Sequence, residues 1–181
     1  DIMLPDSKKV FILDGDIIRT GLNKDLGFTK EDRAENIRRI TEVAKLFALL
    51  DDCIVAFISP YGNDRDYAKE VHQKFNLPFF ECHIAANLEV CEKRDVKGLY
   101  KKARDGIIKN FTGISDPYEA PKHPDLKIET GTESLEQCVD QVITAIKNAK
   151  IIEPVEAQKT ESDGETWKYL TIGAIVGLLG G

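Results

Sequence analysis

Charged side chains directly follow a short apolar stretch near the start of the chain. Residues 10–13 are apolar, Asp14, Gly15 and Asp16 come next, and Arg19 lies three residues further on. An apolar run of this length predicts a buried strand, and open α/β sheets hold their ligands at the carboxyl ends of such strands. There the Asp16 carboxylate could accept a proton from a substrate hydroxyl or hold Mg²⁺ through water. The alternative is that Asp16 only caps a turn.

A second pair of polar residues stands near the start of a predicted helix. Thr29, with Asp32 three residues later, resembles a capping box, and Arg33 and Asn36 follow directly. Their spacing of three puts Arg33 and Asn36 on one helix face, near the positive end of the helix dipole. A guanidinium fork at this place is suited to binding oxyanions.

Short apolar runs alternate with helical patterns along the first 150 residues. The runs that predict strands are 10–13, 53–58, 79–84 and 126–128. The patterns that predict helices are 64–75, 88–94, 134–147 and the stretch after Thr29 in which Ile37, Ile40, Ala44 and Phe47 recur at helical spacing. Ser134, with Gln137 at the third position, starts the last of these helices. The alternation predicts a doubly wound α/β fold with a parallel sheet and helices on both faces.

Composition limits the class of protein. With 42% hydrophobic and 31% charged residues, the chain can bury a core, and we expect one domain over residues 1–150. A net charge of −6 provides no basic field for nucleic acid, so nucleic acid is not an expected partner. An anionic nucleotide would have to be held by local arginines and lysines.

Cysteine and histidine spacing gives no sign of a metal site. The cysteines form no CxxC pair and lie in or beside apolar runs, at Cys53, Cys82, Cys91 and Cys138. We interpret them as buried free thiols of a reducing compartment, with a Cys82–Cys91 disulfide as the alternative. The histidines are scattered, at His72, His83 and His123, and we predict no structural metal.

Several further segments carry a resemblance to a known family. Besides residues 11–39, they are 57–61 (FISPY), 77–81 (LPFFE), 94–104 (RDVKGLYKKAR), 111–114 (FTGI) and 117–121 (PYEAP). Across about residues 8–147 the chain resembles adenylylsulfate (APS) kinase, the family that phosphorylates the 3′-hydroxyl of adenosine 5′-phosphosulfate with ATP to give PAPS. The resemblance implies a P-loop-kinase-like fold, a role in sulfate assimilation, and Mg²⁺ with ATP as cofactor.

The resemblance also implies roles for individual residues. Asp16 matches the catalytic aspartate. The positions that match substrate-binding residues are Arg19, Phe28, Arg33, Asn36, Ile58, Ser59, Lys97 and Phe111. Phe28 and Phe111 would sandwich the adenine, at roughly 1–3 kcal/mol of stacking per ring.

The basic run at 94–104 has two interpretations. Composition alone favours a solvated helix face. The resemblance instead implies a mobile lid that closes on the nucleotides, with Arg94, Lys101 and Arg104 on its ATP side.

Departures from the family pattern count against a complete kinase. The family carries a strand, a GxxGxGK[ST] loop and a helix ahead of its DGD strand, whereas this sequence contains no such loop. The loop's backbone amides and lysine hold the phosphates of ATP, so ATP binding is in doubt. Other departures are Ile17 in place of an amide, Gly62 in place of a basic residue, and 84–87 (IAAN) in place of VDAP. We therefore expect either a fragment of a kinase or a catalytically inactive APS-binding or interaction protein.

The C-terminal part is a separate problem. Residues 151–166 have the composition of a polar linker, and residues 167–181 form an apolar, glycine-rich tail in which Gly173, Gly177 and Gly181 recur every fourth residue. The uncharged run 170–181 is shorter than the about 20 residues that span a bilayer. A C-terminal membrane anchor and a partner-docking or disordered tail both remain open. Otherwise we expect a cytoplasmic homodimer.

Overall fold

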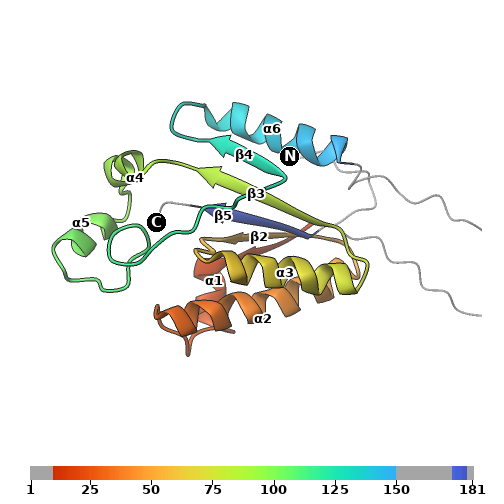
Figure 1. The fold of residues 1–181 in the computed structure, drawn as a ribbon, viewed down its shortest axis with the longest axis horizontal. Coiled ribbons are helices and arrows are strands. Elements are labelled where there is room, and N and C mark those ends of the chain that lie inside the picture. The colour runs from red at the N-terminus through yellow and green to blue at the C-terminus, as the bar shows by residue number, and fades with distance from the viewer. Residues whose placement is uncertain (1–9, 150–172, 179–181) are drawn as a thin grey trace, which may run out of the picture.

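The computed structural model describes residues 10–149 and the backbone of 173–178 (Figure 1). Its strands are β1 (Val10–Asp14), β2 (Asp52–Phe57), β3 (Phe79–Ala85), β4 (Leu126–Glu129) and β5 (Gly173–Leu178). Its helices are α1 (Gly15–Thr20), α2 (Lys30–Ala48), α3 (Gly62–Lys74), α4 (Leu88–Arg94), α5 (Leu99–Arg104) and α6 (Leu135–Asn148). The four strands and the four long helical patterns predicted within 10–149 are confirmed, with ends that differ by one or two residues.

The strands form one parallel sheet in the order β1-β2-β5-β3-β4. Figure 1 shows α2 and α3 against one face of the sheet and α6 against the other. This arrangement confirms the doubly wound α/β fold. Because the strands are parallel, their carboxyl ends lie at one edge, where Asp14 ends β1 and Phe57 ends β2.

The central strand comes from the C-terminal tail. β5 pairs with β2 from Cys53↔Gly173 to Phe57↔Gly177, and with β3 from Phe79↔Gly173 to Ile84↔Leu178. The glycine spacing that suggested a packed membrane helix is therefore, at 173–178, part of a strand. The physical reason is that a central parallel strand is covered on both faces and reads as a continuous apolar run.

Other parts of the tail interpretation fall outside the structure. The linker at 151–166 and the tail residues 167–172 and 179–181 lie beyond the described residues. Within the described part of the chain, no helix has the length and apolar character needed to cross a membrane.

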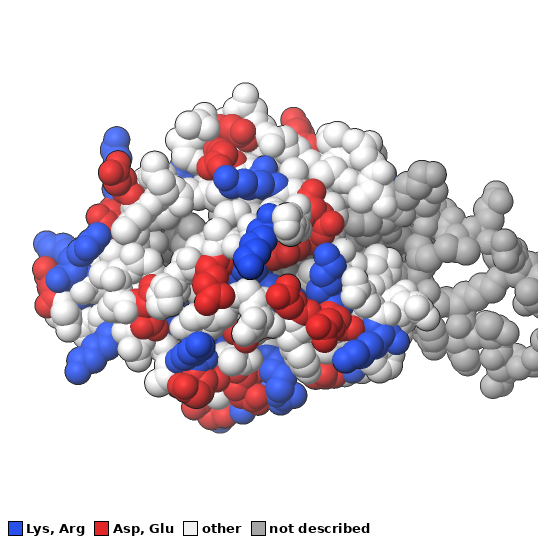
Figure 2. All heavy atoms as spheres, viewed as in Figure 1, with Lys and Arg blue, Asp and Glu red and all other residues white. Residues whose placement is uncertain are grey.

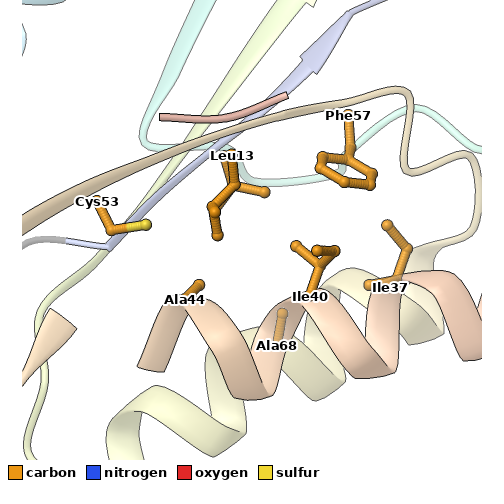
Figure 3. Packing of buried hydrophobic residues seen from close by; sticks show 8 residues of the cluster. Leu13, Ile37, Ile40, Ala44, Cys53, Phe57 and Ala68 are labelled. Atoms are coloured by element: carbon orange, nitrogen blue, oxygen red, sulfur yellow. The ribbon is translucent and has the colours of Figure 1, made fainter. Parts of the chain in front are cut away.

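Two apolar clusters hold the helices to the sheet. In the first, Ile37, Ile40 and Ala44 of α2 pack against Leu13 and Phe57 of β1 and β2 (Figure 3). Ile40 is only 1% exposed, so its burial contributes roughly 1.5–3 kcal/mol. In the second, α6 covers β3 and β4 through the buried residues Phe80, Cys82, Ile128 and Cys138.

Side-chain caps set the starts of α2 and α6. The Thr29 hydroxyl accepts a hydrogen bond from the amide of Asp32 at the start of α2. Ser134 and Gln137 form a reciprocal capping box at the start of α6, as predicted.

All four cysteines are buried and none of them is in a disulfide, as predicted, so the alternative Cys82–Cys91 disulfide is not present. Burial raises the pKa of Cys53 to about 12 and that of Cys82 to about 11. These thiols are therefore protonated at neutral pH.

Candidate functional site

The two aspartates after β1 have different roles. The Asp14 carboxylate caps α1 by accepting hydrogen bonds from the amides of Asp16 and Ile17, at 2.8 and 3.2 Å. The turn is thus capped by Asp14, and the Asp16 side chain remains 80% exposed. The Lys97 ammonium donates to Asp16 Oδ2 at 2.7 Å, and this contact raises the pKa of Lys97. A carboxylate and a cation 81 residues apart in sequence therefore meet at the carboxyl edge of the sheet.

Phe28 lies close to two arginines. The guanidinium carbon of Arg19 is 4.4 Å from the centre of the Phe28 ring, and that of Arg33 is 5.4 Å away. Phe28 is nevertheless 53% exposed, so part of its surface is open to a ligand. A cation and an aromatic ring side by side can bind a nucleotide, the ring by stacking on the base and the cation by pairing with its anionic groups.

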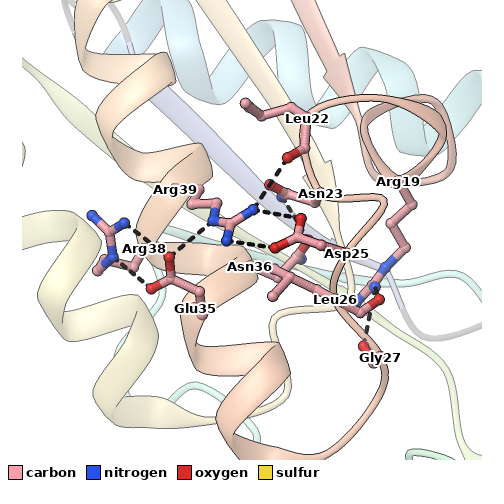
Figure 4. Close-up of polar contacts among 10 residues, drawn as sticks. All are labelled: Arg19, Leu22, Asn23, Asp25, Leu26, Gly27, Glu35, Asn36, Arg38 and Arg39. Atoms are coloured by element: carbon pink, nitrogen blue, oxygen red, sulfur yellow. Dashed lines mark hydrogen bonds and ion pairs between the residues drawn. The ribbon is translucent and has the colours of Figure 1, made fainter.

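Backbone carbonyls hold the two guanidinium groups in place. Arg19 Nη1 donates to the carbonyl oxygens of Leu26 and Gly27, at 3.0 and 3.1 Å (Figure 4). Gly27 lies tightly against α2, because a Cβ there would come within 2.7 Å of the Asp32 carboxylate. Burial lowers the pKa of Arg19, and the neighbouring charge of Arg33 lowers it further. Two partly desolvated cations at one place favour an anionic ligand.

Arg33 also joins the two segments that carry the predicted adenine-binding rings. Its Nε donates to the carbonyl of Phe28 at 3.2 Å, and its Nη2 donates to the carbonyl of Asn110 at 2.8 Å. Asn110 directly precedes Phe111, whose ring packs edge-on against Tyr100 with the centroids 4.9 Å apart. The structure therefore ties the Phe28 and Phe111 segments together through Arg33.

Asn36 has a partner that the sequence did not indicate. The Asn23 amide, which is fully buried, donates to Asn36 Oδ1 at 2.8 Å (Figure 4). Nearby, Arg39 of α2 pairs with Asp25 at 2.7 Å and with Glu35 at 2.9 Å. Together these contacts fix the 22–27 loop against α2. The local sequence does not distinguish Asn23 from the other polar residues of this loop.

The turn after β2 carries Ile58 and Ser59. Ser59 has a positive φ of 42°, which is uncommon for a residue other than glycine, and it is 2% exposed. Among the described residues its hydroxyl has no hydrogen-bond partner. A strained backbone and an unpaired buried hydroxyl at a strand end are features that cluster at functional sites.

The basic run at 94–104 begins at the last residue of α4, passes through a turn at 95–98 and continues into α5. The Asp95 carboxylate accepts hydrogen bonds from the amides of Tyr100 and Lys101, at 3.0 and 3.1 Å, and so caps α5. Lys97, between the helices, is the residue of this run that contacts Asp16.

The three residues predicted to lie on the ATP side of the lid have different surroundings in the structure. Arg94 contacts the backbone carbonyl and the hydroxyl of Thr130, after β4. Arg104 donates to the Glu92 carboxylate of α4 at 2.9 Å through its Nε, and the Lys101 side chain is exposed. In this conformation Arg94 and Arg104 therefore bind other parts of the protein.

A cavity of about 420 Å³ opens at the start of α2. Its lining comes from residues 29–31 at the start of α2, from Tyr61, and from the 110–119 loop. On the face shown in Figure 2, lysine and arginine side chains are interspersed with aspartate and glutamate, without a continuous basic stripe.

Comparison with known proteins identifies the relatives of this chain. A family model described as adenylylsulphate kinase matches residues 2–129. The adenylyl-sulfate kinase of Saccharomyces bayanus is 53% identical over 154 residues, which are 83% of this chain and 75% of that protein. The adenylyl-sulfate kinase of Acaryochloris marina is also 53% identical, over 150 residues, which are 82% of this chain and 72% of that protein.

A solved structure shares both fold and sequence. The Mycobacterium tuberculosis APS kinase CysC, in complex with AMPPNP and APS, matches with a TM-score of 0.73 and 44% identity. The match covers 77% of this chain and 81% of that one.

Proposed function

The chain belongs to the adenylylsulfate kinase family, and from this premise we propose that it binds adenosine 5′-phosphosulfate (APS) and takes part in phosphorylating its 3′-hydroxyl with ATP. The observation that carries the proposal is the contact between Asp16 and Lys97 beside Phe28 and its two arginines. Together these residues supply a proton acceptor, an exposed cation, a stacking ring and an anion site at one edge of the sheet.

The proposed acceptor site divides the substrate among these groups. The adenine stacks on the exposed part of Phe28, and Phe111 takes its other face. Arg19 and Arg33 face the phosphosulfate, because planar guanidinium groups match its oxyanions. Asn36, Ile58 and Ser59 complete the pocket as further substrate-binding residues.

The proposed chemical step is an in-line phosphoryl transfer. The 3′-oxygen of APS forms a bond to the γ-phosphorus of ATP, while the bond from that phosphorus to the β-γ bridging oxygen breaks and releases ADP. Asp16 accepts the proton of the 3′-hydroxyl. Lys97 leaves Asp16 when the nucleotides bind and places its charge beside the transferring phosphoryl group.

The oxygen ligands that the proposed site offers suit a Mg²⁺ ion that arrives with the nucleotide. No group of three or more histidine, cysteine, aspartate or glutamate side chains in the described ranges could hold a metal alone. One exposed carboxylate, Asp16, is enough for Mg²⁺ that is bound mainly by phosphates and water. When bound, the ion would neutralise charge on the β- and γ-phosphates.

A second candidate function is APS binding without catalysis. It is favoured by one observation, that the 181 residues contain no GxxGxGK[ST] sequence to hold the phosphates of ATP. The acceptor-side residues do not depend on that loop, so this candidate predicts APS binding without turnover.

A coupled assay of ADP release separates the two functions. With APS, ATP and Mg²⁺, the native chain should release ADP, and Asp16→Asn should reduce turnover by roughly 10²–10⁴-fold. ADP release that does not depend on APS would contradict the proposal. APS binding with no turnover by the native chain would favour the second candidate.

Assembly and location are further proposals. We infer a homodimer, which light scattering during size-exclusion chromatography would show as twice the 20.3 kDa of one chain. A mass of one chain would contradict it. Buried free thiols support a reducing compartment, and hence a cytoplasmic location.

A further inference from the structure

Arg65 of α3 is a buried charge at the junction of three chain segments. It is 5% exposed, yet it lies outside the residues assigned to the site above. Its Nη1 donates to the carbonyl of Ser59 and its Nη2 to the carbonyl of Glu119, both at 2.6 Å. Its Nε pairs with the Glu81 carboxylate of β3 at 3.0 Å. One guanidinium group therefore joins the turn after β2, the end of the 110–119 loop and the sheet.

Two backbone contacts reinforce the same junction. The Gly62 amide donates to Glu119 Oε2 at 2.7 Å, and the Glu119 amide donates to the carbonyl of Pro60 at 2.8 Å. Gly62 lies close to this carboxylate, since a Cβ there would be 3.3 Å from Glu119 Oε2. Residues 59–62 and Glu119 are thus linked to one another directly, and Arg65 binds both ends of this link through Ser59 and Glu119.

The turn at Ser59 needs such support. Its φ of 42° is a conformation that a serine keeps only where the surrounding structure fixes it. Arg65 binds the carbonyl of this same residue. A guanidinium group can serve two carbonyls and a carboxylate at once because its five donors are arranged in a rigid fork, whereas a lysine ammonium offers a single point of charge.

We propose that Arg65 is a positioning residue for the acceptor site, which holds Ile58 and Ser59 and the 116–119 end of the loop in the geometry that binds APS. The proposal rests on the proposed function. The linked segments line the ligand side: Tyr61, Asp116, Pro117 and Glu119 all face the 420 Å³ cavity. A site that is already ordered binds its ligand without the entropic cost of ordering two loops.

The alternative is that Arg65 serves stability alone. Its partner Glu81 is 14% exposed, and burial raises the pKa of Glu81 while Arg65 opposes that rise. Breaking this ion pair should destabilise the protein whether or not the site depends on it. The test must therefore separate APS affinity from folding stability.

Three full-length variants make that separation. Arg65→Met removes all the polar contacts of Arg65, Arg65→Lys keeps the charge without the fork, and Glu81→Gln removes the charge of the ion pair but leaves both carbonyl contacts in place. Each is assayed by calorimetric titration with APS, by urea unfolding, and by amide hydrogen exchange at Gly62 and Glu119 without ligand.

The expected pattern is specific. Arg65→Met should weaken APS binding at least tenfold and speed exchange at Gly62 and Glu119. Arg65→Lys should show an APS affinity and exchange rates between those of Arg65→Met and the native chain. If Arg65→Met does not fold, the test is made with Arg65→Lys. Glu81→Gln should lower the urea midpoint while APS affinity stays within twofold. Equal loss of stability in Arg65→Met and Glu81→Gln, with native APS affinity and native exchange in both, would overturn the proposal.

The exchange measurement keeps this test independent of the proposed function. If the native chain does not bind APS, the proposed function fails, and exchange at Gly62 and Glu119 still decides whether Arg65 orders the junction. Native protection of both amides in Arg65→Met would overturn the positioning role.

Discussion

Replacing Phe28 with alanine should weaken APS binding far more than it destabilises the fold. Phe28 is 53% exposed, and its ring centre lies 4.4 Å from the guanidinium carbon of Arg19 and 5.4 Å from that of Arg33. Loss of one stacking face costs about 1–3 kcal/mol of binding free energy, or about 5- to 150-fold in Kd. Because about half of the Phe28 surface is already in water, the unfolding free energy should fall by well under the ~3–5 kcal/mol of a buried Phe→Ala change.

The chain supplies a matched control for this prediction. Phe75, after α3, is also 53% exposed and has the Lys45 ammonium 4.5 Å from its ring centre, but it is not part of the proposed site. Calorimetric titration with APS should show a loss of affinity in Phe28→Ala and native affinity in Phe75→Ala, while Phe28→Tyr, which keeps the ring face, should bind like the native chain. Equal APS affinity in Phe28→Ala and Phe75→Ala would refute the assignment of Phe28 to the adenine.

Three further outcomes are expected. Lys97→Met should lower the turnover number by roughly 10²-fold, because a cation is lost from the transferring phosphoryl group, and should leave the Tm unchanged, since Lys97 is exposed. The same change at Lys102, an exposed lysine of α5, should leave turnover unchanged. Burial lowers the pKa of both His72 and His83 from the ordinary 6.5, so their contribution to stability is fully present above about pH 6.5 and is lost as the pH falls toward the lowered values. Urea unfolding between pH 5 and 7 should show that the unfolding free energy rises with pH. The His72→Gln variant should show a smaller rise, and an unchanged rise in that variant would count against the reasoning. Ile175→Pro, which removes a backbone donor between β2 and β3, should cost at least ~2 kcal/mol of unfolding free energy more than Ile175→Ala, which keeps it; equal urea midpoints would show that β5 does not stabilise the sheet.

Local sequence patterns predicted much of the fold. The capping residues Thr29 and Ser134 marked the starts of α2 and α6, because a hydroxyl before an apolar period satisfies amides that a helix leaves unpaired. The β-branched and aromatic runs marked β1 to β3. These features depend on neighbours within a few residues, and they can be read without knowledge of the rest of the chain.

The role of the tail could not be read in this way. Glycines at 173 and 177 fit a packed helix as well as a strand, and a run of six apolar residues does not say which strands it joins. Its place between β2 and β3 is a long-range pairing that local spacing does not encode. The same limit explains why the buried position of Arg65 could not be predicted. An arginine in a charged stretch predicts a solvated helix face, whereas the three partners of Arg65 come from segments brought together only by folding.

The site was predicted through family resemblance more than through residue spacing. Arg33 and Asn36 were placed on one face of α2 by their spacing alone, and the structure agrees. The meeting of Asp16 with Lys97 joins residues 81 apart, which no local pattern indicates. Arg94 and Arg104 show the limit of the resemblance, since in this conformation they contact Thr130 and Glu92.

The most direct test of the central claim is calorimetric titration of the full chain with APS in the absence of ATP. The account predicts saturable binding with one APS per chain, and a clear loss of affinity in Arg33→Met, because Arg33 joins the Phe28 and Phe111 segments as well as facing the anion. Absence of saturable heat up to millimolar APS from a folded native chain would contradict an acceptor site built from Asp16, Phe28 and Arg33.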